Sequence, residues 1–277
     1  MMFDKLDKIG KSLVQHGKSN NRIYLLKLDA DDVPSIIPEL DSLAKKNGYT
    51  KIFTKIQADV LPEFILNGYT VEAYVPRFYN GKTDCIMASK FLDDKRRVLS
   101  AELMESFAGL FNRNGKGSKK ELPPRFKINM LGESDAEAAA KIFSAVFETY
   151  PFPVHEPAYL RQTMRDNLAR YYGVWEDNKL IGLSTAETDF EKENAEMTDF
   201  AVLPEYRGNG LASHLLSYME KEMKKEGIKT AYTIARLAEP GMNLTFMKGG
   251  YNFSGTLINN TNIGGNIESM NIFYKLL

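Results

Sequence analysis

The residues with the clearest chemistry in this chain lie within 196–226, EMTDFAVLPEYRGNGLASHLLSYMEKEMKKE. Two glycines there lack the Cβ atoms that would keep a ligand away from the backbone, and the first turn of a helix leaves about four N–H groups free. Such a turn binds anions, so the segment predicts a pyrophosphate-binding loop. An apolar strand leads into the loop and a helix follows it directly. The loop residues are Arg207, Gly208, Asn209, Gly210, Leu211 and Ala212.

Other phosphate-binding motifs share these residue types but not their spacing. A Walker loop needs a second glycine five residues before its Gly-Lys-Ser triplet, and neither 10–12 nor 17–19 has one. A dinucleotide fingerprint needs a third glycine where Ser213 stands. The spacing Arg207-x-x-Gly210-x-Ala212 instead matches the R/Q-x-x-G-x-G/A pattern of acyl-CoA loops.

On this loop, the strand before it and the helix after it, the sequence resembles the GCN5-related N-acetyltransferase (GNAT) superfamily. The resemblance implies a GNAT fold of the α/β class, with a mixed sheet flanked by helices. It also implies acetyl-CoA as co-substrate, with no metal. The cofactor would be held by the loop and by the end of the strand, at Phe200, Ala201 and Val202. The backbone N–H near Val202 is the family's usual donor to the thioester or pantetheine.

Composition and charge argue against several other classes of protein. The chain has 277 residues, 43% of them apolar, which is enough for two hydrophobic cores. Lys+Arg and Asp+Glu balance at 36 each, so no net basic field exists to bind nucleic acid or an anionic membrane. No apolar run approaches about 18 residues and no signal peptide is recognisable, so we expect a cytoplasmic protein. Cys85 is alone and the three histidines are scattered, which predicts neither a disulfide nor a metal site.

A polar, glycine-rich stretch at 112–124 predicts a linker between an N-terminal domain, 1–118, and a catalytic domain, 119–277. A basic phosphate-binding loop is the alternative for the same stretch. Beyond it the pattern predicts the superfamily's element order, with Ser134 and Glu137 capping the first helix. The predicted strands are 126–130, 172–175, 180–188, 196–202, 230–235, 251–258 and 268–274, and the predicted helices are 134–147, 157–168, the helix after the loop, and 242–248.

The first half contains a motif that recurs near the end of the second. The pattern Phe-x-x-x-Gly-Tyr occurs at 64–69 and again at 246–251, each time after one β-rich run and before two more. The first half has no R-x-x-G-x-A loop. We therefore predict a truncated GNAT-like N-terminal domain that does not bind CoA. Packing, the contact of a homodimer, or closure of one side of the substrate site are its expected roles.

Transfer of an acetyl group to an amine needs a base for the ammonium proton. The resemblance places a glutamate on the strand before the loop, six residues before Val202, and Glu196 occupies that position. Asp199 is the second candidate, on the opposite face of a regular strand unless a bulge turns it round. An edge carboxylate in water is the alternative for both.

The usual acid of the superfamily, which protonates the leaving thiolate, is missing here. Many members carry a tyrosine where this chain has Phe246, and phenylalanine has no proton to donate. Tyr251, Tyr232 or an ordered water could replace it, with Tyr251 as the first candidate. The thiolate could also leave unaided, because a thiol pKa of about 8.5 makes this step undemanding.

Several polar segments could bind a small cationic substrate, although polar residues are also common in turns. Tyr150 and Phe152, in the loop after the first catalytic-domain helix, could form an apolar wall for a methylene chain. We place 259–262 in the final hairpin. The candidate contacts to the substrate's polar ends are Glu187, Asn259, Asn260, Glu268 and Asn271.

Segments 196–201, 233–236, 241–243 and 268–271 narrow the resemblance to a GNAT family that acetylates a small diamino acid, and this likeness extends over essentially all 277 residues. It implies acetyl transfer to the terminal amine of (3S)-3,6-diaminohexanoate, beta-lysine, giving a zwitterion that serves as a compatible solute under salt stress. One alternative is a GNAT enzyme acting on a polyamine, lysine or a protein lysine. Another is a non-catalytic CoA-binding module, in which no amine would cause release of CoA.

Overall fold

The computed structural model of the protein describes residues 4–113, 121–148 and 150–277. Helices and strands are interspersed along the chain. In order, they are β1 (Lys5–Ile9), β2 (Ser12–Gly17), β3 (Arg22–Lys27), α1 (Ile36–Asn47), β4 (Lys51–Gln57), α2 (Leu61–Leu66), β5 (Thr70–Tyr79), β6 (Thr83–Phe91), α3 (Ala101–Arg113), β7 (Phe126–Met130), α4 (Ala136–Val146), α5 (Pro157–Arg165), β8 (Ala169–Glu176), β9 (Lys179–Asp189), β10 (Asn194–Val202), α6 (Leu211–Lys225), β11 (Thr230–Arg236), α7 (Pro240–Lys248), β12 (Asn252–Ile263) and β13 (Asn266–Leu276).

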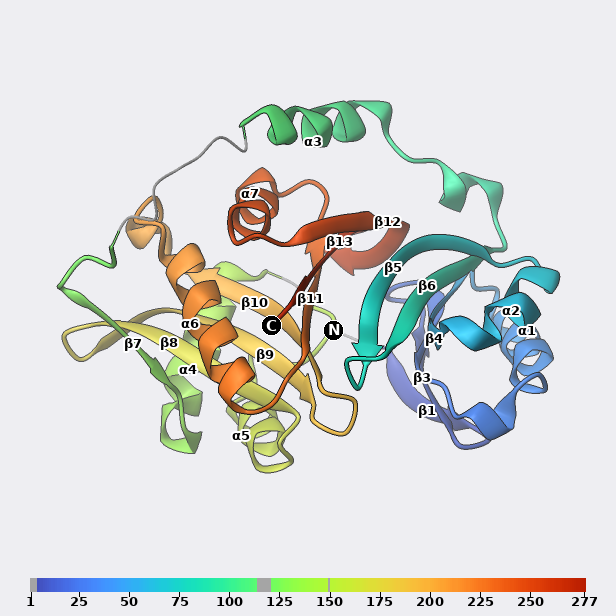
Figure 1. The fold of residues 1–277 in the computed structure, drawn as a ribbon, viewed down its shortest axis with the longest axis horizontal. Coiled ribbons are helices and arrows are strands. Elements are labelled where there is room, and N and C mark those ends of the chain that lie inside the picture. Colours follow the sequence, from blue (N-terminus) through green and yellow to red (C-terminus); the bar gives the residue numbers. More distant parts are fainter. Residues whose placement is uncertain (1–3, 114–120, 149) are drawn as a thin grey trace.

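The strands form two mixed sheets, which meet at the centre of the molecule (Figure 1). The first half contributes six strands in the order β1-β2-β3-β4-β6-β5. The second half contributes seven in the order β12-β13-β11-β10-β9-β8-β7. Each sheet has a parallel pair, β3 with β4 and β10 with β11, and its other neighbours are antiparallel. The mixed α/β architecture expected from the sequence is confirmed.

The first sheet has the same strand order as the second sheet without its edge strand β7. Strands β1 to β6 correspond to β8 to β13, with α1 and α6 linking the parallel pairs and α2 and α7 following them. The irregularities recur as well. Pairing shifts after Val75 in β5 and after Leu257 in β12, and two residues further on Arg77 and Asn259 both have positive φ. Elements β7, α4 and α5 have no counterpart among the described residues of the first half.

The Phe-x-x-x-Gly-Tyr motif ends both α2 and α7 in the same way. In each copy the tyrosine N–H donates to the phenylalanine carbonyl, with N···O distances of 3.1 Å, across a glycine of positive φ. The rings meet edge to face, with centroids 5.1 Å apart for Phe64 and Tyr69 and 5.2 Å apart for Phe246 and Tyr251. Glycine adopts this φ without a Cβ clash, which explains its place in the motif.

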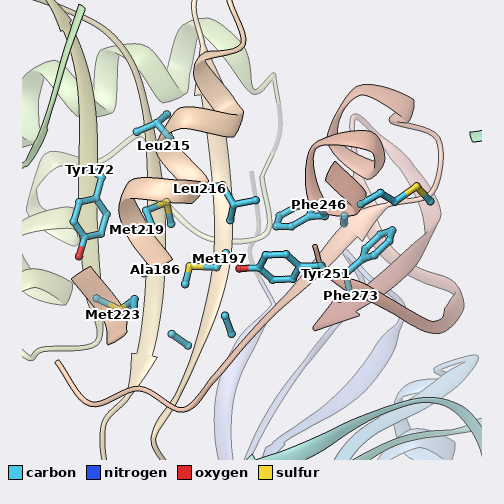
Figure 2. Close-up of a cluster of buried hydrophobic side chains, with 14 of the residues drawn as sticks. Tyr172, Ala186, Met197, Leu215, Leu216, Met219, Met223, Phe246, Tyr251 and Phe273 are labelled. Carbon is cyan, nitrogen blue, oxygen red and sulfur yellow. The ribbon is translucent and has the colours of Figure 1, made fainter. Parts of the chain in front are cut away.

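Helix α6 covers one face of the second sheet with the apolar stripe that its spacing predicts. Ala186 of β9 and Met197 of β10 lie under it, and Phe246 and Tyr251 extend the same cluster toward α7 (Figure 2). This packing holds the start of α6, and with it the glycine loop, against the end of β10. The buried stripe consists of Leu211, Leu215, Leu216, Met219 and Met223.

The opposite face of the second sheet has two different partners. Helices α4 and α5 cover it around β8 and β9, with Phe143 and Leu160 in their core. The first sheet covers β11, β12 and β13 through a shared cluster that includes Phe53 and Tyr232. Polar side chains of β9 and β10 lie between these two partners.

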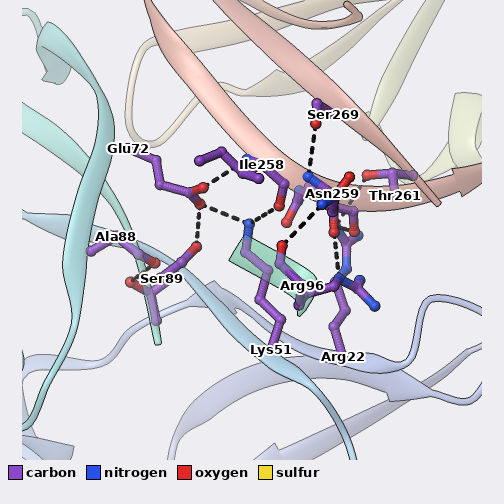
Figure 3. A network of polar contacts seen from close by, with 12 residues as sticks. Arg22, Lys51, Glu72, Ala88, Ser89, Arg96, Ile258, Asn259, Thr261 and Ser269 are labelled. Atoms are coloured by element: carbon purple, nitrogen blue, oxygen red, sulfur yellow. Dashed lines mark hydrogen bonds and ion pairs between the residues drawn. The ribbon is translucent and has the colours of Figure 1, made fainter. Parts of the chain in front are cut away.

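Buried cations of the first half hold β12 (Figure 3). The three successive carbonyls 258–260 accept hydrogen bonds from Lys51 at 2.7 Å, Arg96 at 2.6 Å and Arg22 at 2.5 Å. Lys51 also pairs with Glu72 at 2.8 Å. These carbonyls lie in the bulge where β12 does not pair with β13, so the cations satisfy groups that the sheet leaves free.

The corresponding bulge of β5 receives a reciprocal contact from the second half. Asn194 Nδ2 donates to the carbonyl of Phe78 at 3.3 Å, and Thr230 Oγ1 donates to that of Arg77 at 2.8 Å. Asn194 and Thr230 begin the pairing of β10 with β11. They hold the same register positions as the buried arginine and lysine that begin the pairing of β3 with β4. Equivalent strands of the two sheets therefore donate hydrogen bonds that join the sheets.

The final hairpin differs from its prediction. Residues 259–262 lie inside β12, whose last residues pair with β13 from Thr261 to Ile263, and the turn comes at 264–265. The asparagines were assigned to the hairpin connection because polar residues favour turns. Within the strand, the side chains of Asn259 and Asn262 donate to carbonyls of the first half, at Arg96, Val98 and Ser19.

The start of α4 also differs from its prediction. A short 3-10 turn, Glu133–Asp135, precedes the helix, and the Gly132 N–H donates to the Asp135 carboxylate at 2.8 Å. The predicted cap by Ser134 and Glu137 is therefore wrong: Ser134 lies inside the 3-10 turn, and the reciprocal contact is made two positions earlier, by Asp135 to Gly132.

Helix α3 packs on the second half although it precedes residue 118. Its Phe107 ring contacts Phe253 and Phe273, with centroids 4.9 and 6.3 Å away, and α3 crosses above α7 (Figure 1). The boundary expected between residues 118 and 119 falls within 114–120, outside the described residues.

Candidate active site

The glycine loop consists of a 3-10 turn (Pro204–Tyr206), two left-handed glycines and the first turn of α6. Gly208 has φ +83°, and Gly210, which immediately precedes α6, has φ +71°. A Cβ added at either glycine would meet no atom within 4 Å, so both face open space. Arg207 is exposed, and the first turn of α6 has no acidic residue. The loop therefore fits a pyrophosphate held by the N–H groups of this helix start.

Strands β10 and β11 separate beside this loop. They pair over 194–196 and 230–232, and then diverge. A bulge lies between Thr198 and Ala201, where β10 shifts against β9, and Asp199 there has φ +54°. The bulge turns Asp199 to the sheet face of Glu196, as the sequence had allowed.

A cavity of ≈ 750 Å³ runs from the glycine loop through the gap between the strands. Tyr150, Asp199 and Phe246 also line it, and we call the part beside Tyr150 and Asp199 the acceptor end. Ala201 is buried against the α4–α5 core, and Asn209 bonds the Tyr206 carbonyl at 2.9 Å. The expected cofactor residues that line the cavity are Phe200, Val202, Arg207, Gly208, Gly210, Leu211 and Ala212.

Three carboxylates lie close to one another; Asp199 lines the cavity, and Glu187 and Glu196 lie beside it, outside the lining residues. Glu196 of β10 and Glu187 of β9 are paired across their strands, one residue out of phase with the side chains that contact α6. The bulge adds Asp199, whose carboxylate accepts hydrogen bonds from the Tyr150 hydroxyl and, at 3.2 Å, from Thr198. Two predicted base candidates and one predicted substrate contact are thus brought together.

Burial raises the pKa of all three carboxyl groups. Glu187 is exposed at its strand position, yet the protein atoms around its carboxyl and the charges of Glu196 and Asp199 raise its pKa. Hydrogen bonds and a nearby lysine oppose the increase at Asp199 and Glu196 without cancelling it. A carboxyl with a raised pKa is better matched to accept a proton at neutral pH. The cluster also attracts cations.

Lys55 of β4 reaches this region from the first sheet. Its Nζ donates to the Tyr232 hydroxyl at 3.3 Å and lies 5.4 Å from the centroid of the Tyr24 ring. Tyr232 in turn is paired with Glu196 across β10 and β11 and lowers the pKa of that carboxyl. Burial alone would lower the pKa of Lys55, but Tyr24 and Glu196 raise it above its usual value. The lysine therefore stays charged at neutral pH.

Four predicted substrate contacts lie elsewhere, and their assignment is corrected. Asn259 and Asn260 belong to the contact between the halves, where their carbonyls accept from buried arginines. Asn271 is buried and hydrogen-bonded within the core of the second half. Glu268 holds Arg236, at 2.6 and 2.8 Å, and it is Arg236 that lines the cavity. Their polarity serves packing and positioning.

Two aromatic assignments also change. Tyr251 is buried against Phe246 (Figure 2). It lies outside the cavity lining, and burial together with the charge of Glu220 raises its pKa. Because Tyr251 does not line the cavity, its position does not favour it as the acid. Phe152 packs against the α4–α5 core, whereas Tyr150 lines the cavity as expected.

Lys55, Tyr24 and Arg236 were not predicted. A signal for Lys55 exists in strand 51–57, Lys-Ile-Phe-Thr-Lys-Ile-Gln, because alternation places Lys51 and Lys55 on one face with Phe53. Lysines beside a buried aromatic residue need charged partners. Their partners could not be named from the sequence, because they lie on other strands and, for Lys55, in the other half of the chain.

Within residues 4–113, 121–148 and 150–277, no group of three or more His, Cys, Asp or Glu side chains is arranged to hold a metal ion. None of the helices in these ranges is long and apolar enough to cross a membrane.

Residues 137–241, which contain the separated strands and the glycine loop, match the model of the acetyltransferase (GNAT) family. The chain belongs to this family: it is an N-acetyltransferase that uses acetyl-CoA. Over 275 residues, 99% of both chains, it is 38% identical to the beta-lysine N(6)-acetyltransferase of Methanococcus maripaludis. It is 31% identical to N-acetyltransferase YodP of Bacillus subtilis over 96% of each chain. It is also 31% identical to the beta-lysine N(6)-acetyltransferase of Methanosarcina mazei, over 84% of this chain and 93% of that one.

Proposed function

We propose that the enzyme acetylates the terminal amine of beta-lysine, giving N6-acetyl-beta-lysine. The observation that carries this proposal is the 38% identity, over 99% of both chains, to a beta-lysine N(6)-acetyltransferase. The carboxylates at the acceptor end support it, since beta-lysine carries two ammonium groups. The product is a zwitterion, which suits storage as a compatible solute during osmotic stress in the cytoplasm.

Glu196 is the proposed base, acting directly or through a water. It lies where β10 and β11 begin to separate, and burial raises its pKa. Asp199, which lines the cavity but is engaged by Tyr150, is the second candidate. Bound acetyl-CoA would supply the activated acetyl group, and the N–H near Val202 would orient it. Because Phe246 donates no proton, the thiolate leaves unaided or takes a proton from water.

Residues 1–118 are proposed to form a truncated GNAT-like domain without a CoA site, and 119–277 the catalytic domain. The matching strand order, the shared bulges and the two Phe-x-x-x-Gly-Tyr motifs support a common origin for the two halves. A homodimer remains part of this proposal.

The substrate is tested by following CoA release with beta-lysine, alpha-lysine, ornithine and spermidine at equal concentrations. We expect beta-lysine to exceed alpha-lysine in kcat/KM by up to about 10⁴-fold, because a displaced amine leaves buried polar partners unpaired. Equal values for these two, or a preference for spermidine, would contradict beta-lysine as the substrate and would leave the acetyltransferase assignment unaffected.

A further inference from the structure

Lys55 brings a positive charge from the first half to the carboxylates of the second. Its charge lowers the pKa of both Glu196 and Glu187. Tyr232 makes the connection, since Lys55 Nζ donates to the Tyr232 hydroxyl at 3.3 Å and Tyr232 is the register partner of Glu196 on the neighbouring strand. An ammonium can only donate, so the Tyr232 oxygen accepts from Lys55 and its own proton is free to point toward Glu196. The arrangement therefore directs the hydroxyl proton of Tyr232 toward the carboxylate of Glu196.

We infer that Lys55 is a positioning residue for the reaction, which acts through Tyr232 to keep Glu196 ionised and oriented as the base. The inference rests on the proposed role of Glu196. It gives the first half a part in catalysis, although that half has no glycine loop of its own.

Groups from several strands face Glu196, and their charges compete. Burial raises its pKa and the neighbouring carboxylate of Asp199 adds to the increase, whereas Lys55 and the Tyr232 hydrogen bond lower it. Without the lysine charge, Glu196 would hold its proton to a higher pH, and a protonated carboxyl cannot accept one from the substrate. The facing groups are Lys55 of β4, Tyr24 of β3, Glu187 of β9, Asp199 of β10, and Tyr232 with the Ile234 N–H of β11.

The test is the pH dependence of kcat/KM in Lys55→Met, measured with whichever amine the wild type acetylates best. We expect the acid limb of the profile to move to higher pH by about one unit, the usual size of an effect from a nearby opposite charge. Lys55→Arg, which keeps the charge, should return the limb most of the way. The affinity for acetyl-CoA should not change.

Lys27→Met is the matched control. Lys27 is another lysine of the first half that contacts the second sheet, with its Nζ 3.1 Å from Asp189, but it lies on the surface with 66% of its side chain exposed. An unmoved acid limb in Lys55→Met, or an equal displacement in Lys27→Met, would overturn the inference.

A double substitution tells whether Lys55 acts through Glu196. In the Glu196→Gln background, adding Lys55→Met should leave the residual pH profile unchanged, and a further displacement would show that the lysine acts on another group. Full activity in Glu196→Gln alone would instead remove the base assignment. Because the assay uses the best acceptor found, the inference can fail or hold independently of beta-lysine.

Discussion

The connection after β3 and the connection after β10 occupy the same place in their sheets but differ in conformation and charge. Before α6, Gly208 and Gly210 are left-handed and face open space. Before α1, no described residue from 22 to 47 has positive φ, and three aspartates crowd residues 29–32. Asp32 there already accepts hydrogen bonds from Ser12. A repeated backbone is thus suited to an anion only where its loop exposes N–H groups without nearby negative charge.

The two parallel pairs of strands, β3 with β4 and β10 with β11, also differ in charge. At equivalent register positions the first sheet has Tyr24 opposite Phe53, and the second has Glu196 opposite Tyr232. The first half places aromatic rings where the second places a charge, and both contribute to the junction between the sheets. One half therefore carries the proposed base, and the other places aromatic rings and Lys55 beside it.

The largest effect is expected from a substitution in the glycine loop, compared with one in the connection before α1. Gly210→Glu would place a carboxylate toward the phosphates of CoA, at a cost of about 4 kcal/mol for each charge 4 Å away in a site of effective dielectric constant near 20. We expect acetyl-CoA binding to fall below detection by calorimetry while the far-UV circular dichroism stays unchanged. The matched control is Ser35→Glu, at the exposed start of α1, which should bind normally. Near-normal affinity in Gly210→Glu would show that the loop is not the CoA site.

The next largest effect is expected from Glu196, which the second sheet has where the first sheet has Tyr24. Glu196→Gln keeps the shape of the side chain but removes its basicity, so kcat should fall by about 10²- to 10⁴-fold with little change in acetyl-CoA affinity. In the wild type, activity should decrease as the pH falls through the pKa of Glu196, which burial places above the ordinary glutamate value. Glu191→Gln, on the exposed β9–β10 turn, is the control. If Asp199→Asn is inactive and Glu196→Gln is not, the role passes to Asp199.

The smallest effect compares the two reciprocal contacts between the sheets. Lys51→Met leaves the buried Glu72 without its cation and the Ile258 carbonyl without a donor, so we expect a loss of about 3 kcal/mol in the free energy of unfolding. Thr230→Val removes the equivalent neutral hydrogen bond to Arg77 and should cost about 1 kcal/mol. Urea denaturation of the full chain measures both. Equal losses would mean that the cation adds nothing beyond a hydrogen bond.

The sequence predicted most of the elements in the second half, because their signals are local. The stripe of α6 appears as its spacing predicted, and so do the strands before and after it. The geometry of the glycine loop could also be predicted from the sequence, since two glycines before a helix determine which N–H groups stay free. The predicted cap at Ser134 was wrong, because the neighbouring Asp135 accepts the hydrogen bond from Gly132 instead.

The carboxylate site could be predicted only in part. Glu196 was found from its place on the strand, but the side on which Asp199 lies depends on a bulge that no residue type demands. The amides of 259–262 looked available to a substrate because nothing nearby in the chain satisfies them. Their partners are Arg22 and Arg96, far away in sequence.

By itself, therefore, the sequence determined the acyl-CoA loop, the helix that supports it and the class of chemistry, because each depends on backbone conformation within a few residues. The tertiary structure decided which polar side chains serve the reaction. It turned Asp199 to the face of Glu196, placed Tyr251 in the core and carried Lys55 to Tyr232. Those outcomes follow from the packing of two sheets against each other, which brings together charges that lie in different halves of the chain.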